Sequence, residues 1–344
     1  MNRRHVLGAL ALGMAGGAQA QASWQVVAVP FYTPADVLVG WYRWFAVPQA
    51  RAAHEAALVL AQTLGATCRG ELGMEQARRR WGEAVAAWER LSAVATGPVL
   101  WRRSLRQIDF APTRPNLIER AVRAQPRGAE ALERIGTPAK GWPALEWLLW
   151  RQPMAAASPA CAYAQELGQD LTRHMQALRD DFERLAQRTP QDWSEAEVAA
   201  GMDELVNQWV GAVERLRWAA MEKPLRSGAL QTLPRQTSGR TVQSWRHHWE
   251  AIAALARAGA QVPTPGEGLV SFESYLRGRG WNELADRWRA AVEGAERGVL
   301  AATPQQPETV TGAAQALAAL KRLAESELAP AFDVRMGFSD ADGD

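Results

Sequence analysis

The stretch TPAKGWPALEWLLW, residues 137–150, decides the fold because it joins a helix start to a dense aromatic and aliphatic surface. Pro143 suits the first turn of a helix, where the missing N–H of proline would have no intrahelical partner. Trp142, Glu146 and Trp150 recur every four residues and therefore share one helical face. A carboxylate among so much apolar surface needs a partner. Glu146 is therefore either a paired glutamate of a core helix or a functional carboxylate.

Helical periodicity continues on both sides of this stretch, and no run alternates in the manner of a β-strand. About ten helices with short connections predict an all-α bundle protein. We expect a break between the first two helices near Pro48. Most of the sixteen tryptophans are expected to anchor the core between helices. Besides the opening stretch, helices are expected at residues 35–45, 49–64, 74–94, 99–106, 117–124, 128–135, 160–187, 194–222, 240–258, 269–277, 281–300 and 305–329.

Residues 1–20 have the pattern of a cleavable signal peptide. Arg3 and Arg4 lie in a basic head, an apolar run covers residues 6–18, and an A-x-A cleavage site ends at Ala20. The run is shorter than the roughly 20 residues that a membrane-spanning helix needs. The two arginines resemble a twin-arginine export signal, although they also suit ordinary secretion. We expect an exported periplasmic protein that is not an integral membrane protein.

Charge and cysteine content indicate which partners are disfavoured and whether a disulfide forms. The chain has 39 Lys and Arg residues against 37 Asp and Glu residues, and cleavage after residue 20 removes two arginines. The formally neutral remainder gives no electrostatic case for binding nucleic acid. Cys68 and Cys161 are the two cysteines, and in an oxidising compartment a disulfide is favoured over free buried thiols. A boundary near residue 155 would divide the chain into an N-terminal half (21–155) and a C-terminal half (156–344).

Three irregular segments carry charged or polar side chains. The first is the proline-rich loop at 108–116, and its charges either tie the loop to the bundle as ion pairs or belong to a site. The second, residues 235–241, either caps the following helix or contributes to a site. The third is the tail at 337–344, which is too short for a twelve-residue calcium loop and reads as a solvated acidic end. The charged residues in and before the first segment are Arg102, Arg103, Arg106, Asp109 and Arg114.

The chain resembles the imelysin-like family of bacterial envelope proteins, because a series of short motifs follows the order found in that family. The resemblance implies an all-α fold of two helical-bundle halves, packed around a shared inter-domain site where the motif segments meet. It also implies an association with bacterial iron acquisition. The motifs are Ala87-Trp88, Gly97-Pro98, the loop from Arg106 through Ile108-Asp109-Phe110 and Pro112 to Arg114, Gly141-Trp142-Pro143-Ala144-Leu145-Glu146, Ser238-Gly239-Arg240-Thr241, and Gly337-Phe338 with Asp342-Gly343-Asp344.

One position departs from the family pattern. The family has been labelled a metallopeptidase group on the strength of a G-x-H-x-x-E motif, in which His and Glu share a helical face and can hold one metal. Pro143 occupies the histidine position here and has no ligand atom. A zinc peptidase needs a set of ligands and an open position for water, so this change favours a protein that is not an enzyme. His247 and His248 lie about 100° apart on a helix and cannot readily share one metal.

The resemblance and the residues together predict a binding site made by Glu146, Asp109, Arg106, Arg114, Trp142, Ser238 and Arg240, with Glu146 as its metal ligand. Such a carboxylate–guanidinium network could hold a ferric ion or an anionic iron ligand, or could only stabilise the junction of the two halves. The predicted function is a non-catalytic binding component of iron acquisition. Its expected partners are iron, an iron-bearing ligand or envelope iron-uptake proteins. The alternatives are an imelysin-type metallopeptidase and an envelope interaction scaffold.

Overall fold

The computed structural model describes residues 29–152 and 154–337, and this part of the chain is helical without a β-strand. The predicted all-α fold is confirmed. The expected signal peptide and the tail from Phe338 onward lie outside the described residues. The α-helices are α1 (Pro34–Gly40), α2 (Val47–Cys68), α3 (Met74–Ser92), α4 (Pro98–Trp101), α5 (Ser104–Ile108), α6 (Pro115–Ala124), α7 (Gly128–Glu133), α8 (Gly141–Arg151), α9 (Pro159–Leu185), α10 (Glu195–Glu214), α11 (Lys223–Arg226), α12 (Thr241–Ala256), α13 (Phe272–Gly278), α14 (Asn282–Ala301), α15 (Pro307–Leu323) and α16 (Ala329–Ala331).

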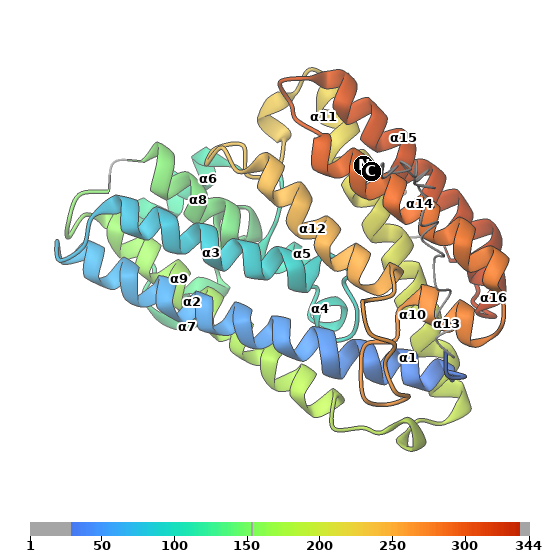
Figure 1. The fold of residues 1–344 in the computed structure, drawn as a ribbon. Helices are drawn as coiled ribbons and strands as arrows, with labels where there is room; N and C mark the ends of the chain where they lie inside the picture. The colour runs from blue at the N-terminus through green and yellow to red at the C-terminus, as the bar shows by residue number, and fades with distance from the viewer. Residues whose placement is uncertain (1–28, 153, 338–344) are drawn as a thin grey trace, which may run out of the picture.

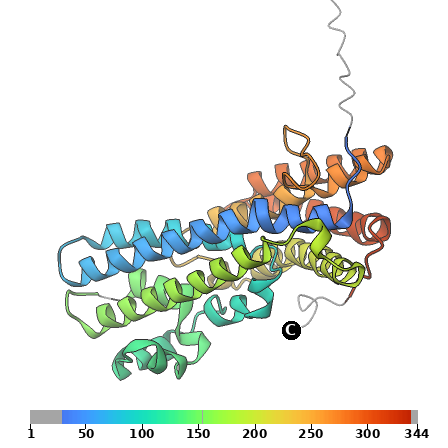
Figure 2. The ribbon, with the colours of Figure 1, turned by 90° about the horizontal axis from the view of Figure 1, so that it is seen from below.

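Two groups of helices pack against each other through α3 and α12 (Figure 1). In the first group α2 packs along both α3 and α9, and α8 packs on α3 and α9. Figure 2 shows α2 and α9 side by side over much of their length. In the second group α14 packs along α15, while α10 and α12 pack against these two helices. The expected division at residue 155 stays a prediction, and α9, which follows it, packs with the first group.

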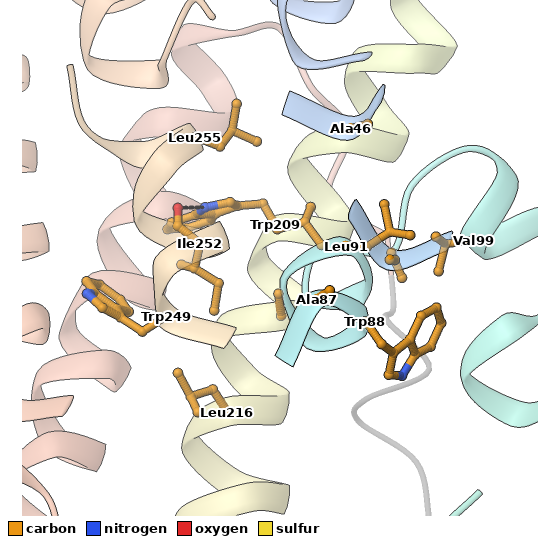
Figure 3. Packing of buried hydrophobic residues seen from close by; sticks show 14 of the residues in the cluster. Ala46, Ala87, Trp88, Leu91, Val99, Trp209, Leu216, Trp249, Ile252 and Leu255 are labelled. Atoms are coloured by element: carbon orange, nitrogen blue, oxygen red, sulfur yellow. Dashed lines mark hydrogen bonds between the residues drawn. The ribbon is translucent and has the colours of Figure 1, made fainter. Parts of the chain in front are cut away.

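Tryptophans fill the core, as their number predicts. Figure 3 shows Ala87 and Leu91 of α3 close to Trp209 of α10 and Ile252 of α12. The Trp209 indole N–H donates to the Ile252 carbonyl at 2.9 Å, which satisfies its polar atom inside the apolar core. Helix α3 therefore belongs to the cores of both groups. The fully buried tryptophans are Trp41, Trp81, Trp88, Trp142, Trp209, Trp245 and Trp288.

Three long helices continue past a proline through a π-helical segment. These segments are η1 (Trp41–Ala46), η4 (Arg215–Glu222) and η6 (Ala324–Leu328), and each ends two residues before Pro48, Pro224 or Pro330. A proline lacks the N–H of a helical hydrogen bond and crowds the carbonyl four residues earlier. In a π turn each carbonyl accepts a hydrogen bond from the N–H five residues later, in place of four residues later. The helix can therefore accommodate the proline without ending. The expected break near Pro48 is therefore wrong, and one helix runs from residue 34 to residue 68.

Local signals fix other helix ends. Ser194 caps α10, and Glu197 bonds back to the Ser194 backbone in a reciprocal capping box.

The predicted disulfide is confirmed: Cys68 at the end of α2 joins Cys161 at the start of α9, with their Cα atoms 5.6 Å apart. Among the described residues, no helix combines the length and the apolar character needed to cross a membrane.

Candidate functional site

The start of α8 is built against the loop that follows α5. Gly141 has φ +76°, in the left-handed region that favours glycine. A Cβ atom at this position would lie 2.0 Å from the Ile108 carbonyl oxygen. Glycine is therefore required both by its own backbone conformation and by the close approach of a second backbone. This contact places Asp109, the next residue of the loop, beside the first turns of α8.

We expect Gly141→Ala to lower the free energy of unfolding by about 3 kcal/mol. The left-handed conformation costs a residue with a Cβ about 1–2 kcal/mol, and the clash with a packed backbone adds about 1–3 kcal/mol. Denaturant unfolding measures the loss. Gly239→Ala is the matched control, because Gly239 has φ +72° but no atom within 4 Å of its Cβ position. The control should lose only about 1 kcal/mol; equal losses in the two variants would contradict the proposed contact.

Glu146 is buried one turn and a half into α8, with 4% of its surface exposed. Its Oε1 accepts a hydrogen bond from the Ser238 backbone N–H at 2.8 Å. Burial raises the pKa of Glu146, although nearby Arg235 and Ser238 oppose this shift. The carboxylate is therefore held in place by a loop of the second half of the chain, and its environment disfavours the negative charge.

Arg235 is the cation at the centre of the site. Its guanidinium donates two hydrogen bonds to the Asp109 carboxylate, at 2.8 and 2.7 Å, and one to Glu89 Oε1 at 2.8 Å. Trp88 also holds Asp109, since its indole N–H donates to Asp109 Oδ2 at 2.8 Å. Arg235 has φ 52°, a conformation that is unfavourable for a residue with a side chain. The bidentate pair and the bond to Glu89 hold the loop in this shape.

Glu89 is the deepest carboxylate of the network, with 1% of its surface exposed. Besides Arg235, it accepts hydrogen bonds from the Ser244 hydroxyl at 2.7 Å and from His247 Nδ1 at 2.8 Å. Burial alone would raise its pKa, but Arg235 and the hydrogen-bond donors lower it to about 2. Glu89 is therefore ionised at neutral pH, and both of its carboxylate oxygens accept hydrogen bonds inside the protein.

A cavity of about 190 Å³ lies beside this network. It is lined by the 108–113 loop, the first turns of α8, the segment 231–237 and one face of α12. The side chains that give it chemical character are those of Asp109, Glu146, Arg235, Ser244 and His248, and Pro143 forms part of its wall. Segments far apart in the sequence thus meet at one polar cavity.

Negative charge exceeds positive charge around this cavity. Glu89, Asp109 and Glu146 are opposed by Arg235, which is the one lysine or arginine among the described residues that line the cavity or bond directly to these carboxylates. Burial lowers the pKa of His248, which favours its neutral form. Three carboxylates thus share one guanidinium, and because burial raises the pKa of Glu146, a cation bound beside it would favour its ionised form.

The structure brings only some of the predicted site residues together. Asp109 and Glu146 line the same cavity, and Ser238 bonds to Glu146. Trp142 is fully buried behind them, and no acceptor among the described residues pairs with its indole N–H. The Arg240 guanidinium lies over Gly82 of α3 instead of facing the cavity.

The remaining predicted arginines lie away from the cavity. Arg106 and Arg114 are exposed, and neither forms an ion pair or hydrogen bond with another described side chain.

The capping interpretation of residues 235–241 is wrong, because no side chain caps the start of α12. The Ser238 hydroxyl donates instead to the Arg235 carbonyl, and the Thr241 hydroxyl donates to the Pro234 carbonyl. Both bonds hold the 235–241 segment in its folded shape.

Sequence reasoning missed three residues of the site. Arg235 lies three residues before Ser238, and Glu89 directly follows Trp88, so both could have been found as neighbours of motif residues. His248 lies four residues after Ser244 on the same face of α12. Within the described ranges, no set of three or more His, Cys, Asp or Glu side chains is placed to hold a metal ion.

Comparisons with known proteins agree with this fold. A family model described as imelysin, Peptidase_M75, matches residues 46–327. A solved structure of an imelysin-like protein from Psychrobacter arcticum 273-4 aligns with a TM-score of 0.73 at 20% identity, covering 91% of this chain and 100% of that chain. A putative iron-regulated protein A precursor from Parabacteroides distasonis ATCC 8503 aligns with a TM-score of 0.71 at 13% identity, covering 85% of this chain and 93% of that one. A comparison with curated proteins finds no match.

Proposed function

Because the chain belongs to the imelysin family, we propose that it is an exported, non-catalytic binding protein of bacterial iron acquisition. The iron would bind in the cavity beside Glu146. The observation that carries the proposal is the excess of carboxylates over cations around this cavity. A buried anion without full compensation is costly, and a bound metal cation would supply the missing charge. The similarity to an iron-regulated protein A precursor is in keeping with iron as that cation.

The cavity volume favours a small ligand. Pockets for drug-sized molecules have volumes of about 300–1,000 Å³, whereas this cavity has about 190 Å³. Since one water molecule occupies about 30 Å³, the space suits a metal ion with a few waters or a small chelating anion. Haem and large iron chelates would not fit without movement of the loops.

Residue chemistry supports binding in preference to hydrolysis. Pro143 forms part of the cavity wall where the family motif has a histidine, and proline offers no lone pair to a metal. A hydrolytic zinc site holds its metal through about three protein ligands and keeps one position for water. Export is supported by the signal-like residues 1–20 and by the disulfide, because disulfides persist in oxidising compartments such as the periplasm.

The direct test is a calorimetric titration of the secreted protein with ferric nitrilotriacetate, with ferrous ion under anaerobic conditions, and with haemin. We expect saturable binding of one iron ion and no binding of haemin. Glu146→Gln should weaken iron binding by about tenfold or more, because it removes a charged ligand while keeping the shape of the side chain. Thermal unfolding without iron would verify that the variant folds.

Glu204→Gln is the matched control. Glu204 also accepts a hydrogen bond from a backbone N–H, that of Gly97 at 2.6 Å, and burial also raises its pKa. It does not line the cavity, so its substitution should leave iron binding unchanged. Absence of iron binding in both oxidation states would refute the proposal, and chelator-sensitive cleavage of an unfolded protein substrate would favour the peptidase alternative.

A further inference from the structure

We propose that His248 is a second metal donor in the cavity, so that Glu146 of α8 and His248 of α12 hold one ferrous ion between them. This inference rests on the proposed function and adds a ligand, a metal oxidation state and a bridge between the two groups of helices. It begins from the position of His248, whose side chain lines the same 190 Å³ cavity as Glu146.

The hydrogen bond of His248 fixes which ring nitrogen is available. Nδ1 lies 2.8 Å from the Ser244 carbonyl oxygen. A carbonyl oxygen only accepts, so Nδ1 carries the proton of the neutral ring and Nε2 carries the lone pair. No described residue forms a hydrogen bond with Nε2. A histidine whose one nitrogen donates to a backbone carbonyl while the other is free has the arrangement that orients metal-binding histidines in proteins.

His247 shows the contrast on the same helix. Its Nδ1 lies 2.8 Å from Glu89 Oε2, and its side chain does not line the cavity. The two neighbouring histidines therefore have different roles: His247 completes the buried carboxylate network, and His248 faces the space beside Glu146. The rotation of about 100° between adjacent helical residues separates them in this way.

The donor set determines the kind of metal. One neutral imidazole nitrogen with one carboxylate suits divalent iron, copper, nickel or zinc, whereas ferric iron prefers oxygen donors. The excess of carboxylates over guanidinium groups around the cavity favours a cation. Fewer than three protein donors meet at the site, so waters or a small anion would complete the coordination of the ion. Among the divalent metals, copper should bind most tightly and is therefore a useful probe.

The decisive variant is His248→Asn. The asparagine amide N–H can replace the Nδ1–H that donates to Ser244, but no atom replaces Nε2. His54→Asn is the matched control, since it makes the same change at a histidine of α2 that neither lines the cavity nor bonds to its carboxylates. Anaerobic calorimetry with ferrous ion should show about a tenfold or greater loss of affinity in His248→Asn, because even groups that only support a ligand contribute about 10- to 100-fold. His54→Asn should bind ferrous ion with an affinity close to that of the wild type.

Copper(II) provides a spectroscopic readout that does not depend on affinity. Electron paramagnetic resonance of the wild-type protein with one equivalent of copper(II) should show coupling to an imidazole nitrogen. The coupling should persist in His54→Asn and disappear in His248→Asn. A wild-type spectrum without this coupling, or its persistence in His248→Asn, would overturn the inference.

The outcomes also separate this inference from the proposed function. If Glu146→Gln loses iron and His248→Asn retains wild-type affinity, the cavity binds iron without His248, and only the inference is wrong. If the wild-type protein binds neither ferrous nor ferric ion, the proposed function fails and the inference fails with it. Thermal unfolding of each variant without metal identifies any variant that loses binding because it does not fold.

Discussion

Arg235→Met is expected to lower the free energy of unfolding by about 3–5 kcal/mol at neutral pH. The substitution keeps most of the side-chain volume but removes the cation that binds Asp109 and Glu89. Breaking one side of a buried ion pair is costly because the remaining charge is left buried without compensation. Urea or guanidinium unfolding at pH 7 would measure the loss.

The effect should depend on pH in a defined direction. Arg235 helps to hold the pKa of Glu89 at about 2, well below its unfolded value of 4.5. A lowered carboxyl pKa stabilises the fold above the unfolded value, and this contribution is lost as the pH falls toward the folded value. The difference between wild type and Arg235→Met should therefore become smaller as the pH is lowered from 4.5 toward 2.

Two further variants test the cause. Arg240→Met makes the same change five residues later, where the guanidinium lies over Gly82 and forms no ion pair with a described residue. It should cost about 1 kcal/mol or less, from lost packing. Adding Glu89→Gln and Asp109→Asn to Arg235→Met should recover part of the stability, because no uncompensated charge then remains. Equal losses in Arg235→Met and Arg240→Met would contradict the central role of Arg235.

Removal of the disulfide should have an effect of similar size. The bond joins Cys68 to Cys161 across a separation of 93 residues. Closing a loop of that length lowers the entropy of the unfolded chain, which stabilises the fold by about 4.7 kcal/mol at 25 °C. We expect the double variant Cys68→Ser/Cys161→Ser to lose about that much stability in denaturant unfolding.

Reduction supplies the control for this prediction. A reducing agent should lower the stability of the wild type to that of the double variant and leave the double variant unchanged. A double variant within about 1 kcal/mol of the oxidised wild type would show that the loop closure contributes little. Because neither α2 nor α9 lines the cavity, the loss is expected in stability and not in the arrangement of Arg235 and Glu146.

The sequence predicted features that depend on local pattern. Helical periodicity identified the all-α fold, and the predicted disulfide pair was correct. Glu146 was identified because a carboxylate on an apolar helix needs a partner. These features depend on residues a few positions apart, or on the even count of two cysteines.

The partner of Glu146 and Asp109 was not predicted, for a physical reason. Arg106 and Arg114 are near Asp109 in sequence, yet Arg235 forms the bidentate pair. Arg235 reaches Asp109 through a loop in a left-handed backbone conformation, which helical periodicity does not indicate. His248 was set aside because it cannot share a metal with His247, and the fold instead places it beside Glu146.

The uninterrupted helix from residue 34 to residue 68 also has a mechanical consequence. Its first part, α1, packs on α10 of the second group, and its last part, α2, packs on α9 of the first group (Figure 1). A hinge motion that separated the two groups would have to bend this rod and break its backbone hydrogen bonds. If a ligand binds in the cavity, its exchange with solvent is therefore expected through displacement of the lining segment 231–237, while the two groups of helices stay together.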